Sequence, residues 1–321
     1  MSKSFFNLSF VIPCYGSEHT IAAVIDTIHS TMKPHPDYSY EIVCVNDGSP
    51  DHVIDVLTKI AQKDPLCKVL DCAKNNGQHT AVMAGLAHAS GERIAILDDD
   101  GQSPVQNLFQ MVAKMDEGYD VVWASYEDKC NGAFRAFGSW LNEKMLCIML
   151  HKPADIHVSN FCLMARCIAR SVSQCSVPYP YILGYILACS GRLANVKMES
   201  APRLAGQSGY TLRKLLRLWL TGLISFSVVP LRIGTLFGFL LAVLGMLGGI
   251  AVLLVKLLNP NMAAGWPSLF CILVFGFGAV LSMLGLVGEY IGRIHLCVNR
   301  IPQYIIRNRI NFPEEDRKEH E

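Results

Sequence analysis

The stretch Ile96-Leu97-Asp98-Asp99-Asp100-Gly101-Gln102 places three carboxylates in a row at the end of a short apolar run that begins at Ile94. An apolar run bounded by a turn is typical of a buried strand. If the strand geometry persists into the acidic residues, Asp98 and Asp100 lie on one face and Asp99 on the other. Carboxylate oxygens, with the amide oxygen of Gln102 just beyond them, are ligands that Mg²⁺ or Mn²⁺ prefers. Taken alone, the stretch is also compatible with a solvated acidic turn.

Strands and helices are expected to alternate around this stretch. The hydrophobic patterns predict strands at 8–12, 40–45, 67–72, 94–97 and 120–124, and helices at 17–32, 51–63, 78–89 and 104–117. Strands that alternate with helices of ten or more residues predict βαβ units, and therefore an α/β fold with a mostly parallel sheet.

Four polar clusters follow the expected strands. They are Pro13 to Tyr15, Asn46-Asp47, Asp71 to Lys74 and Asp98 to Asp100. In sheets of this kind ligands bind outside the carboxyl ends of the strands. We therefore expect the four clusters to converge at one edge of the sheet and to form a binding site.

Composition and missing motifs exclude several classes of protein. The 321 residues suggest roughly two folding units, and the net charge of +1 gives no reason to expect a nucleic-acid partner. Hydrophobic residues make up 51% of the chain and charged residues 17%, and the apolar excess lies after Arg232. No Gly-x-Gly-x-x-Gly follows the first strand and no Walker motif occurs, so neither a standard dinucleotide site nor a phosphate-loop kinase is expected. The twelve cysteines form no Cys-x-x-Cys pair and read as reduced residues of a cytosolic compartment.

The motifs together resemble a known family. Val11-Ile12-Pro13-Cys14-Tyr15 with Glu18, Val45-Asn46-Asp47-Gly48-Ser49 with Asp51, and Asp98-x-Asp100 are similar to the motifs of family-2 glycosyltransferases of the GT-A fold. Asn75-Asn76-Gly77-Gln78-His79, Ala84-Gly85 and Gln102 narrow the resemblance to polyprenyl-phosphate glycosyltransferases. These include dolichol-phosphate mannose synthase and the undecaprenyl-phosphate sugar transferases. The resemblance runs from about Leu8 to Arg309.

The resemblance implies a role for each matching residue. Nucleotide-sugar binding is expected of Pro13, Tyr15, Glu18, Asp47, Lys74, Gln78, Asp98 and Asp99. A Mg²⁺ or Mn²⁺ ion is expected on Asp98, Asp100 and Gln102. The acceptor phosphate is expected at Lys129, Arg135, Arg203, Ser208 and Tyr210, and the catalytic set is Asp100, Arg203, Arg135 and Lys129.

Several positions depart from the family pattern. Asn46 stands where relatives more often have aspartate, which removes one charge and keeps an acceptor. Tyr126 and Lys129 take places where relatives often have arginine, and Asn160-Phe161-Cys162 lacks another arginine. These departures leave the donor sugar open.

The second half of the chain has the pattern of a membrane anchor. Residues 212–232 mix basic and apolar side chains and are expected to lie in the membrane interface. Ile233 to Val255 and Pro267 to Gly288 carry no charge and are each long enough to span a bilayer, although a buried core hairpin is the alternative. Arginines flank both spans on the outer sides, which predicts that both chain ends are cytoplasmic. The expected organisation is a GT-A domain at 1–211, an interfacial segment at 212–232, a transmembrane hairpin at 233–288, and a juxtamembrane helix with a charged tail at 289–321.

The expected activity is a transfer reaction at the cytoplasmic membrane. The resemblance implies that a sugar moves, with inversion, from a nucleotide-diphosphate sugar, with UDP the expected nucleotide, to a polyprenyl phosphate such as undecaprenyl phosphate. The product would be a lipid-linked sugar for a cell-envelope glycan or lipid modification, and the enzyme a homo-oligomer, a tetramer by family resemblance. A processive polysaccharide synthase is one alternative, but its Gln-x-x-Arg-Trp element is missing. A non-catalytic membrane module that partners a lipid-carrier translocase is the other.

Overall fold

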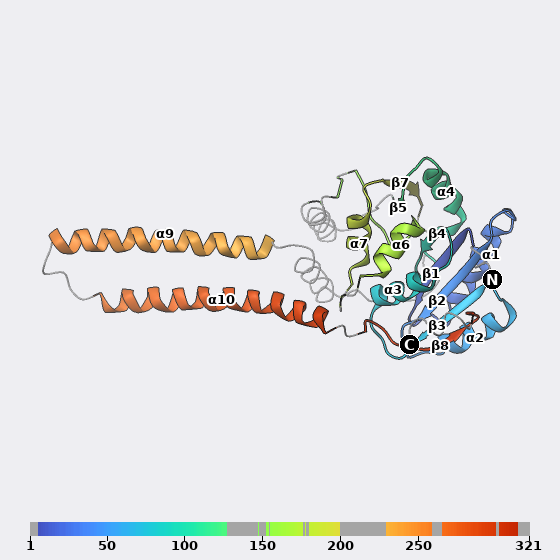
Figure 1. Ribbon diagram of the computed structural model, residues 1–321, viewed down its shortest axis with the longest axis horizontal. Helices are drawn as coiled ribbons and strands as arrows, with labels where there is room; N and C mark the ends of the chain where they lie inside the picture. The colour runs from blue at the N-terminus through green and yellow to red at the C-terminus, as the bar shows by residue number, and fades with distance from the viewer. Residues whose placement is uncertain are drawn as a thin grey trace. The chain divides into compact units, whose positions relative to one another are not determined.

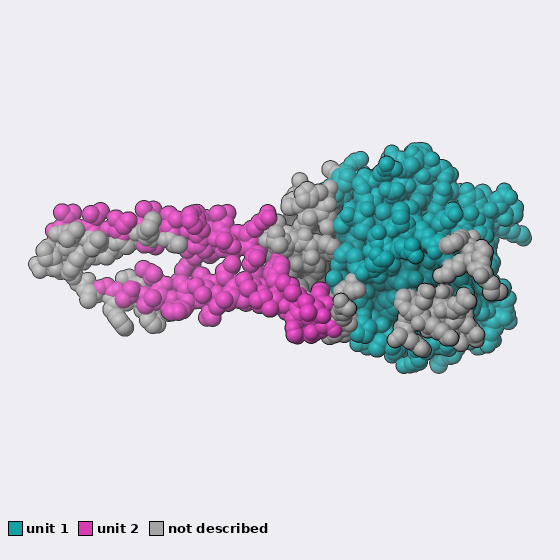
Figure 2. All heavy atoms as spheres, viewed as in Figure 1, with its two compact units in different colours: residues 1–211, 300–321 teal, residues 212–299 magenta. Residues whose placement is uncertain are grey.

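The computed structural model describes residues 6–126, 147, 152–153, 155–175, 177, 180–199, 229–258, 265–299 and 302–313. The chain divides into two compact units, coloured separately in Figure 2. Unit 1 comprises Met1–Thr211 and Arg300–Glu321, and unit 2 comprises Leu212–Asn299. Most of the segment expected in the membrane interface, residues 212–228, lies outside the described residues.

The described part of unit 1 contains one eight-stranded sheet in the order β7-β5-β6-β4-β1-β2-β3-β8 (Figure 1). Its strands are β1 (Leu8–Cys14), β2 (Tyr40–Asn46), β3 (Cys67–Cys72), β4 (Arg93–Ile96), β5 (Val121–Tyr126), β6 (Cys162–Ala165), β7 (Leu193–Met198) and β8 (Ile306–Ile310). Its helices are α1 (Ile21–Met32), α2 (Val53–Lys63), α3 (Gln78–His88), the 3₁₀ turn η1 (Val105–Asn107), α4 (Leu108–Asp116), α6 (Arg166–Ser173) and α7 (Ile182–Cys189). The alternation predicted from 8 to 124 is confirmed, and the sheet is mostly parallel.

Helices cover both faces of the sheet, and alternation along the strands sends side chains to each. Phe10 and Ile12 of β1 belong to a core with α1, α2 and α4. Val11 lies between them in sequence and belongs to a second core with α3, α6 and α7. The pleat turns successive side chains to opposite faces, so a strand covered on both faces reads as a continuous apolar run. This explains why the first strands could be predicted from short runs of apolar residues.

The parallel core is extended by antiparallel strands that the sequence patterns did not predict. β1 pairs in parallel with β2 and β4, β2 with β3, and β5 with β7. β6 inserts antiparallel between β4 and β5, and β8 pairs antiparallel with β3. β8 falls in the segment expected to be a juxtamembrane helix and tail. That expectation is wrong for Ile306–Ile310, because an exposed edge strand need not show an apolar pattern.

Unit 2 contains two long helices, α9 (Val229–Leu258) and α10 (Trp266–Val298). They approach closely at Gly234, where an added Cβ would lie 2.3 Å from the sulfur of Met283. Large apolar side chains are exposed along both, including Leu236 at 60% and Phe277 at 66%. Among the described residues, one helical stretch, Phe275–Val298, is long and apolar enough to cross a membrane, and Leu231–Gly245 is apolar but shorter. The two predicted spans therefore fall in two helices, and among the described residues one of these helices contains a stretch that meets the requirement for a membrane span.

Candidate active site

The four polar clusters lie together at the carboxyl edge of the parallel strands. β1, β2 and β4 end side by side, with Cys14 opposite Asn46 and Val11 opposite Ile96. The backbone beyond β2 remains attached to β1, because the Asp47 amide donates to the Cys14 carbonyl at 3.1 Å. The edge on which ligands bind in parallel sheets is thus lined by the predicted residues.

Asp99 joins the β4 end to the β1 end. Its Oδ2 accepts the backbone N–H of Tyr15 at 3.0 Å. β4 ends at Ile96, so the acidic residues are not part of the strand, and the assumption behind the predicted alternation is wrong. The side chains of Asp98 and Asp99 nevertheless find different partners. Burial raises the pKa of Asp99, and the hydrogen bond from Tyr15 opposes the rise.

Asp98 is held by two amide side chains from different elements. Its Oδ1 accepts from Gln78 Nε2 at 2.7 Å, at the start of α3, and its Oδ2 accepts from Asn160 Nδ2 at 2.8 Å, just before β6. Burial raises the pKa of Asp98 to about 6, and the charges of Asp100 and Asp99 add to the rise. The carboxylate is therefore fixed in orientation while each oxygen keeps a lone pair for a further partner.

Asp100 sits in a tight turn that determines its orientation. Its Oδ1 accepts the backbone N–H of Gln102 at 3.0 Å, and Gly101 between them has φ +76°. An aspartate that accepts from the amide two residues later forms an Asx turn, and glycine adopts positive φ without strain. Tyr126 at the end of β5 lies close by: burial raises the pKa of its phenol, and the charges of Asp98 and Asp100 raise it further.

Asp47 organises the loop between β3 and α3. Its side chain is only 3% exposed, and its two oxygens accept the backbone N–H groups of Asn76 and Gly77, each at 2.8 Å. Burial nevertheless raises its pKa above the ordinary value. Gly48 permits the close approach, because a Cβ there would lie 2.6 Å from the Asn75 nitrogen. Lys74 in this loop has an exposed side chain.

The remaining predicted donor residues frame the β1 end. Pro13 is buried within β1, and Tyr15 is 53% exposed. Glu18 Oε2 accepts the His52 amide at 2.9 Å, while the Glu18 amide donates to Asp51 Oδ2 at 3.0 Å. These reciprocal bonds join the start of the α1 segment to the start of α2.

Asn46 forms a specific pair with a neighbouring carboxylate. It is 4% exposed, and its Nδ2 donates to Asp71 Oδ1 at 2.7 Å, in register between β2 and β3. Its Oδ1 accepts the Ser49 amide at 3.2 Å. An amide suits this position because a carboxylate would face Asp71 with no proton to share.

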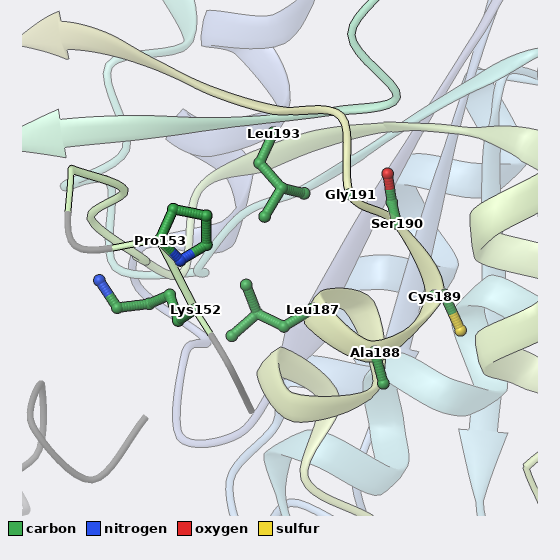
Figure 3. Close-up of a pocket in the computed structure, with 8 residues that line it drawn as sticks. All are labelled: Lys152, Pro153, Leu187, Ala188, Cys189, Ser190, Gly191 and Leu193. Atoms are coloured by element: carbon green, nitrogen blue, oxygen red, sulfur yellow. The ribbon is translucent and has the colours of Figure 1, made fainter. Parts of the chain in front are cut away.

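Several predicted residues cannot be placed. Lys129, Arg135, Arg203, Ser208 and Tyr210 lie outside the described residues. Within the described ranges, no group of three or more His, Cys, Asp and Glu side chains is arranged to hold a metal ion. A hollow of about 340 Å³ lies instead among Lys152, Pro153, Leu187, Ala188, Cys189, Ser190, Gly191 and Leu193 (Figure 3). It contains none of the predicted site residues.

Asn160 is the contact with Asp98 that the sequence analysis did not assign to the site. Sequence reasoning treated it only as part of a stretch lacking an arginine. The available signal was its place directly before the apolar run Phe161 to Met164. The start of an antiparallel strand lies at the same edge as the ends of its parallel neighbours.

Comparison with known proteins agrees with this arrangement. The model of the family described as "Glycosyl transferase family 2" matches residues 9–175. The chain belongs to glycosyl transferase family 2. It is therefore a glycosyltransferase, as its motifs predicted.

Similar proteins cover nearly the whole chain. The bactoprenol glucosyl transferase of Shigella phage SfV is 32% identical, over 94% of this chain and 98% of that protein. The undecaprenyl-phosphate 4-deoxy-4-formamido-L-arabinose transferase of Edwardsiella ictaluri is 31% identical, over 97% of each chain. Among solved structures, glucosyl-3-phosphoglycerate synthase from Mycobacterium tuberculosis, in complex with Mn²⁺, uridine-diphosphate-glucose and phosphoglyceric acid, has a TM-score of 0.51. It is 20% identical and covers 68% of this chain and 79% of that chain, so it supports the GT-A-like fold of this family-2 member.

Proposed function

We propose that this glycosyltransferase moves a sugar, with inversion, from a nucleotide-diphosphate sugar, with UDP as the nucleotide, to undecaprenyl or a related polyprenyl phosphate. The reaction takes place at the cytoplasmic membrane face in a multi-pass protein with both ends in the cytoplasm. The observation that carries the proposal is the convergence of Asp98, Asp99 and Asp100 with the β1 end in a family-2 domain. The printed names of the relatives above support the acceptor.

The residues of the site suit a nucleotide diphosphate. Tyr15 and Glu18 border the β1 end, where we place the nucleoside, with Asp47 directly after β2, Lys74 in the β3–α3 loop and Gln78 at the start of α3. Acceptor binding is assigned to Lys129, Arg135, Arg203, Ser208 and Tyr210. A phosphate monoester is largely ionised near neutral pH, so no general base is needed to create the nucleophile. Catalysis then rests on positioning and on charge stabilisation.

A divalent cation fits the carboxylate end of the site. Burial raises the pKa of Asp98 to about 6, and the nearby charges of Asp100 and Asp99 add to the rise, so a bound cation would offset the cost of keeping this carboxylate charged. Asp98 and Asp100 with the Gln102 side-chain oxygen would supply hard oxygen ligands, which suits Mg²⁺ or Mn²⁺. When bound, the ion stabilises charge on the leaving diphosphate. The protein holds the carboxylates ready through Gln78, Asn160 and the Gly101 turn.

The helices of unit 2 fit a lipid acceptor. α9 and α10 expose large apolar side chains, and Phe275–Val298 has the length and composition of a membrane span. A polyprenyl phosphate lies in the bilayer with its phosphate at the surface. We place the product in the assembly of cell-envelope glycans or lipids, and we expect a homo-oligomer, with the tetramer as the expected state.

The test is product formation in membranes. Membranes that contain the protein are incubated with a panel of nucleotide sugars, and the extracted lipid is analysed by mass spectrometry. We expect one sugar to appear on polyprenyl phosphate. Absence of both nucleotide turnover and product for every donor would refute the proposal and favour the non-catalytic module.

Asp100→Ala tests the metal role in the same assay. It should abolish transfer without loss of folded protein, because Asp100 lies in a turn beyond β4. Lys114→Ala, in the exposed pair with Glu117 away from the strand ends, is the matched control and should keep full activity. Transfer that persists in Asp100→Ala, or in the presence of a chelator, would contradict the metal role.

A further inference from the structure

Residues 302–313 return to the sheet after the second long helix and are called here the C-terminal strap. Residues 299–301 alone separate the end of α10 at Val298 from the start of the strap. The strap contains β8, which pairs antiparallel with the outer side of β3 (Figure 1). Sequence reasoning gave this segment no part in the site.

One side of the strap is bonded to the segment that enters the β3–α3 loop. The Ala73 amide donates to the Ile305 carbonyl at 2.8 Å, and Arg307 Nη2 donates to the Ala73 carbonyl at 3.2 Å. Ala73 is therefore held at both its N–H and its C=O. The next residues of this loop supply the Asn76 and Gly77 amides that bind Asp47.

The start of the strap is bonded to the segment between α6 and α7. Gln303 Nε2 donates to the carbonyls of Cys175 and Val177, at 2.7 and 2.6 Å. That segment leads toward α7, and the ring of Tyr181, directly before α7, lies 5.5 Å, centroid to centroid, from the ring of His79. His79 follows Gln78, so the strap is bonded to the segment that leads into α3 and to a second segment whose continuation contacts His79.

We propose that the C-terminal strap is a positioning element of the nucleotide-sugar site. The hydrogen bonds described above reach Ala73, Cys175 and Val177, none of which is assigned to the donor, so the strap acts through the backbone at 73–78. By fixing Ala73 and the carbonyls of Cys175 and Val177, it keeps the β3–α3 loop in the conformation that satisfies Asp47 and presents Gln78 to Asp98. The proposal rests on the proposed function, because the donor site is the one assigned there.

The local structure of the loop explains why it needs external support. Lys74 and Asn75 are exposed, and Gly77 has φ +92° with nothing within 4 Å of an added Cβ. A loop with few packed side chains opens at low free-energy cost. Binding of the nucleotide sugar is weaker if the loop must become ordered on binding than if the loop is already ordered.

The test compares variants at the two ends of the strap in the full-length protein. Gln303→Met combined with Arg307→Ala removes the side-chain donors to Cys175, Val177 and Ala73. We expect faster amide hydrogen exchange at Asn76 and Gly77. We also expect an increase of about three- to tenfold in the donor KM, with kcat changed less than about twofold, as loss of one or two hydrogen bonds predicts. Arg307→Lys alone keeps a cationic donor and should stay near the wild-type values.

Asn311→Gly is the matched control at the far end. Asn311 Nδ2 donates to the carbonyls of Ala61, Asp64 and Cys67, at 2.7, 3.2 and 2.8 Å, and its φ is +63°. Glycine keeps this backbone conformation and removes only the side-chain bonds. The control should lower the thermal midpoint but leave exchange at 73–78 and the donor KM unchanged.

The outcomes distinguish a specific effect of the strap on the β3–α3 loop from a general effect on the stability of the domain. If Asn311→Gly raises the donor KM as much as the double variant does, the strap acts through stability and the proposal is overturned. Unchanged exchange at Asn76 and Gly77 in the double variant also overturns it. If the wild type transfers no sugar, the proposed function fails. The structural coupling still stands in that case if exchange at Asn76 and Gly77 is faster in the double variant and unchanged in Asn311→Gly.

Discussion

Asn46→Asp should destabilise the protein strongly at neutral pH. The new carboxylate would take the place of an amide that lies 2.7 Å from Asp71 Oδ1, at a position that is 4% exposed. The substitution removes a hydrogen bond to a charged acceptor and puts two negative charges in contact.

The loss in free energy of unfolding for Asn46→Asp can be estimated in two ways, which agree. Two unit charges about 4 Å apart interact with roughly 4 kcal/mol at an effective dielectric constant of about 20. The pair can avoid this repulsion by binding a proton, and at pH 7 that costs about 4 kcal/mol for a carboxyl with an ordinary pKa near 3.9. We expect a loss of about 3–4 kcal/mol, or roughly 6–16 °C in the thermal midpoint.

The pH dependence follows from the sign of the shift. The folded state would raise the pKa of the introduced carboxyl above its unfolded value. The destabilisation is therefore complete above the raised pKa and disappears as the pH falls toward about 4. The assay is thermal unfolding of the wild type and the variant between pH 4 and 8.

The exchanged pair supplies the control. Asn46→Asp combined with Asp71→Asn restores one amide and one carboxylate and should recover most of the stability, as a double-mutant cycle would report. A single variant as stable as the wild type at pH 7, or an exchanged pair with no recovery, would refute the reasoning.

Three further predictions address stability, the acidic turn and topology. Glu41→Ala removes a fully buried carboxylate from its pair with the partly buried Lys68 and should lower the free energy of unfolding by about 3–5 kcal/mol, measured by thermal unfolding, whereas Glu117→Ala in an exposed pair should barely change the midpoint. Gly101→Ala places a side chain at φ +76°, so it should lower the free energy of unfolding by about 1–2 kcal/mol and weaken metal-dependent transfer. Transfer with an unchanged rate and an unchanged metal requirement would contradict the role of the turn. A cysteine at Ala264 should react with a membrane-impermeant reagent while one at Glu315 does not, in a background without reactive thiols, and the reverse labelling would overturn the orientation.

Local sequence patterns were sufficient for the parallel core. β1 to β5 are short apolar runs buried on both faces, and the helices between them carry apolar residues at helical spacing, so each element was recognisable alone. β6 overlaps the apolar run Phe161 to Met164, but its antiparallel place between β4 and β5 has no local signal, and β8 has no apolar pattern. β8 reads Ile-Arg-Asn-Arg-Ile, and its partner β3 lies at residues 67–72, so only a contact distant in sequence makes it a strand.

The site was predictable to the same extent. Polar residues at the ends of predicted strands were expected to converge, and they do. The partner of Asp98 at Asn160 depends on β6, whose antiparallel insertion no local pattern indicates. The bonds from the Asn76 and Gly77 amides to Asp47 depend on loop backbone geometry, which side-chain identities alone do not determine.

The position of β8 after both long helices sets an order of events during biosynthesis. The outer edge of β3 is complete once Cys72 is made, but its partner ends 238 residues later, at Ile310. At about 5–20 residues per second the ribosome needs roughly 12–48 s to cover that distance. Throughout this interval the nascent domain carries an open strand edge, the feature that invites pairing with other chains. A fragment that ends at Thr211 to avoid the long helices keeps that edge open permanently, and its tendency to aggregate would follow from the missing strand.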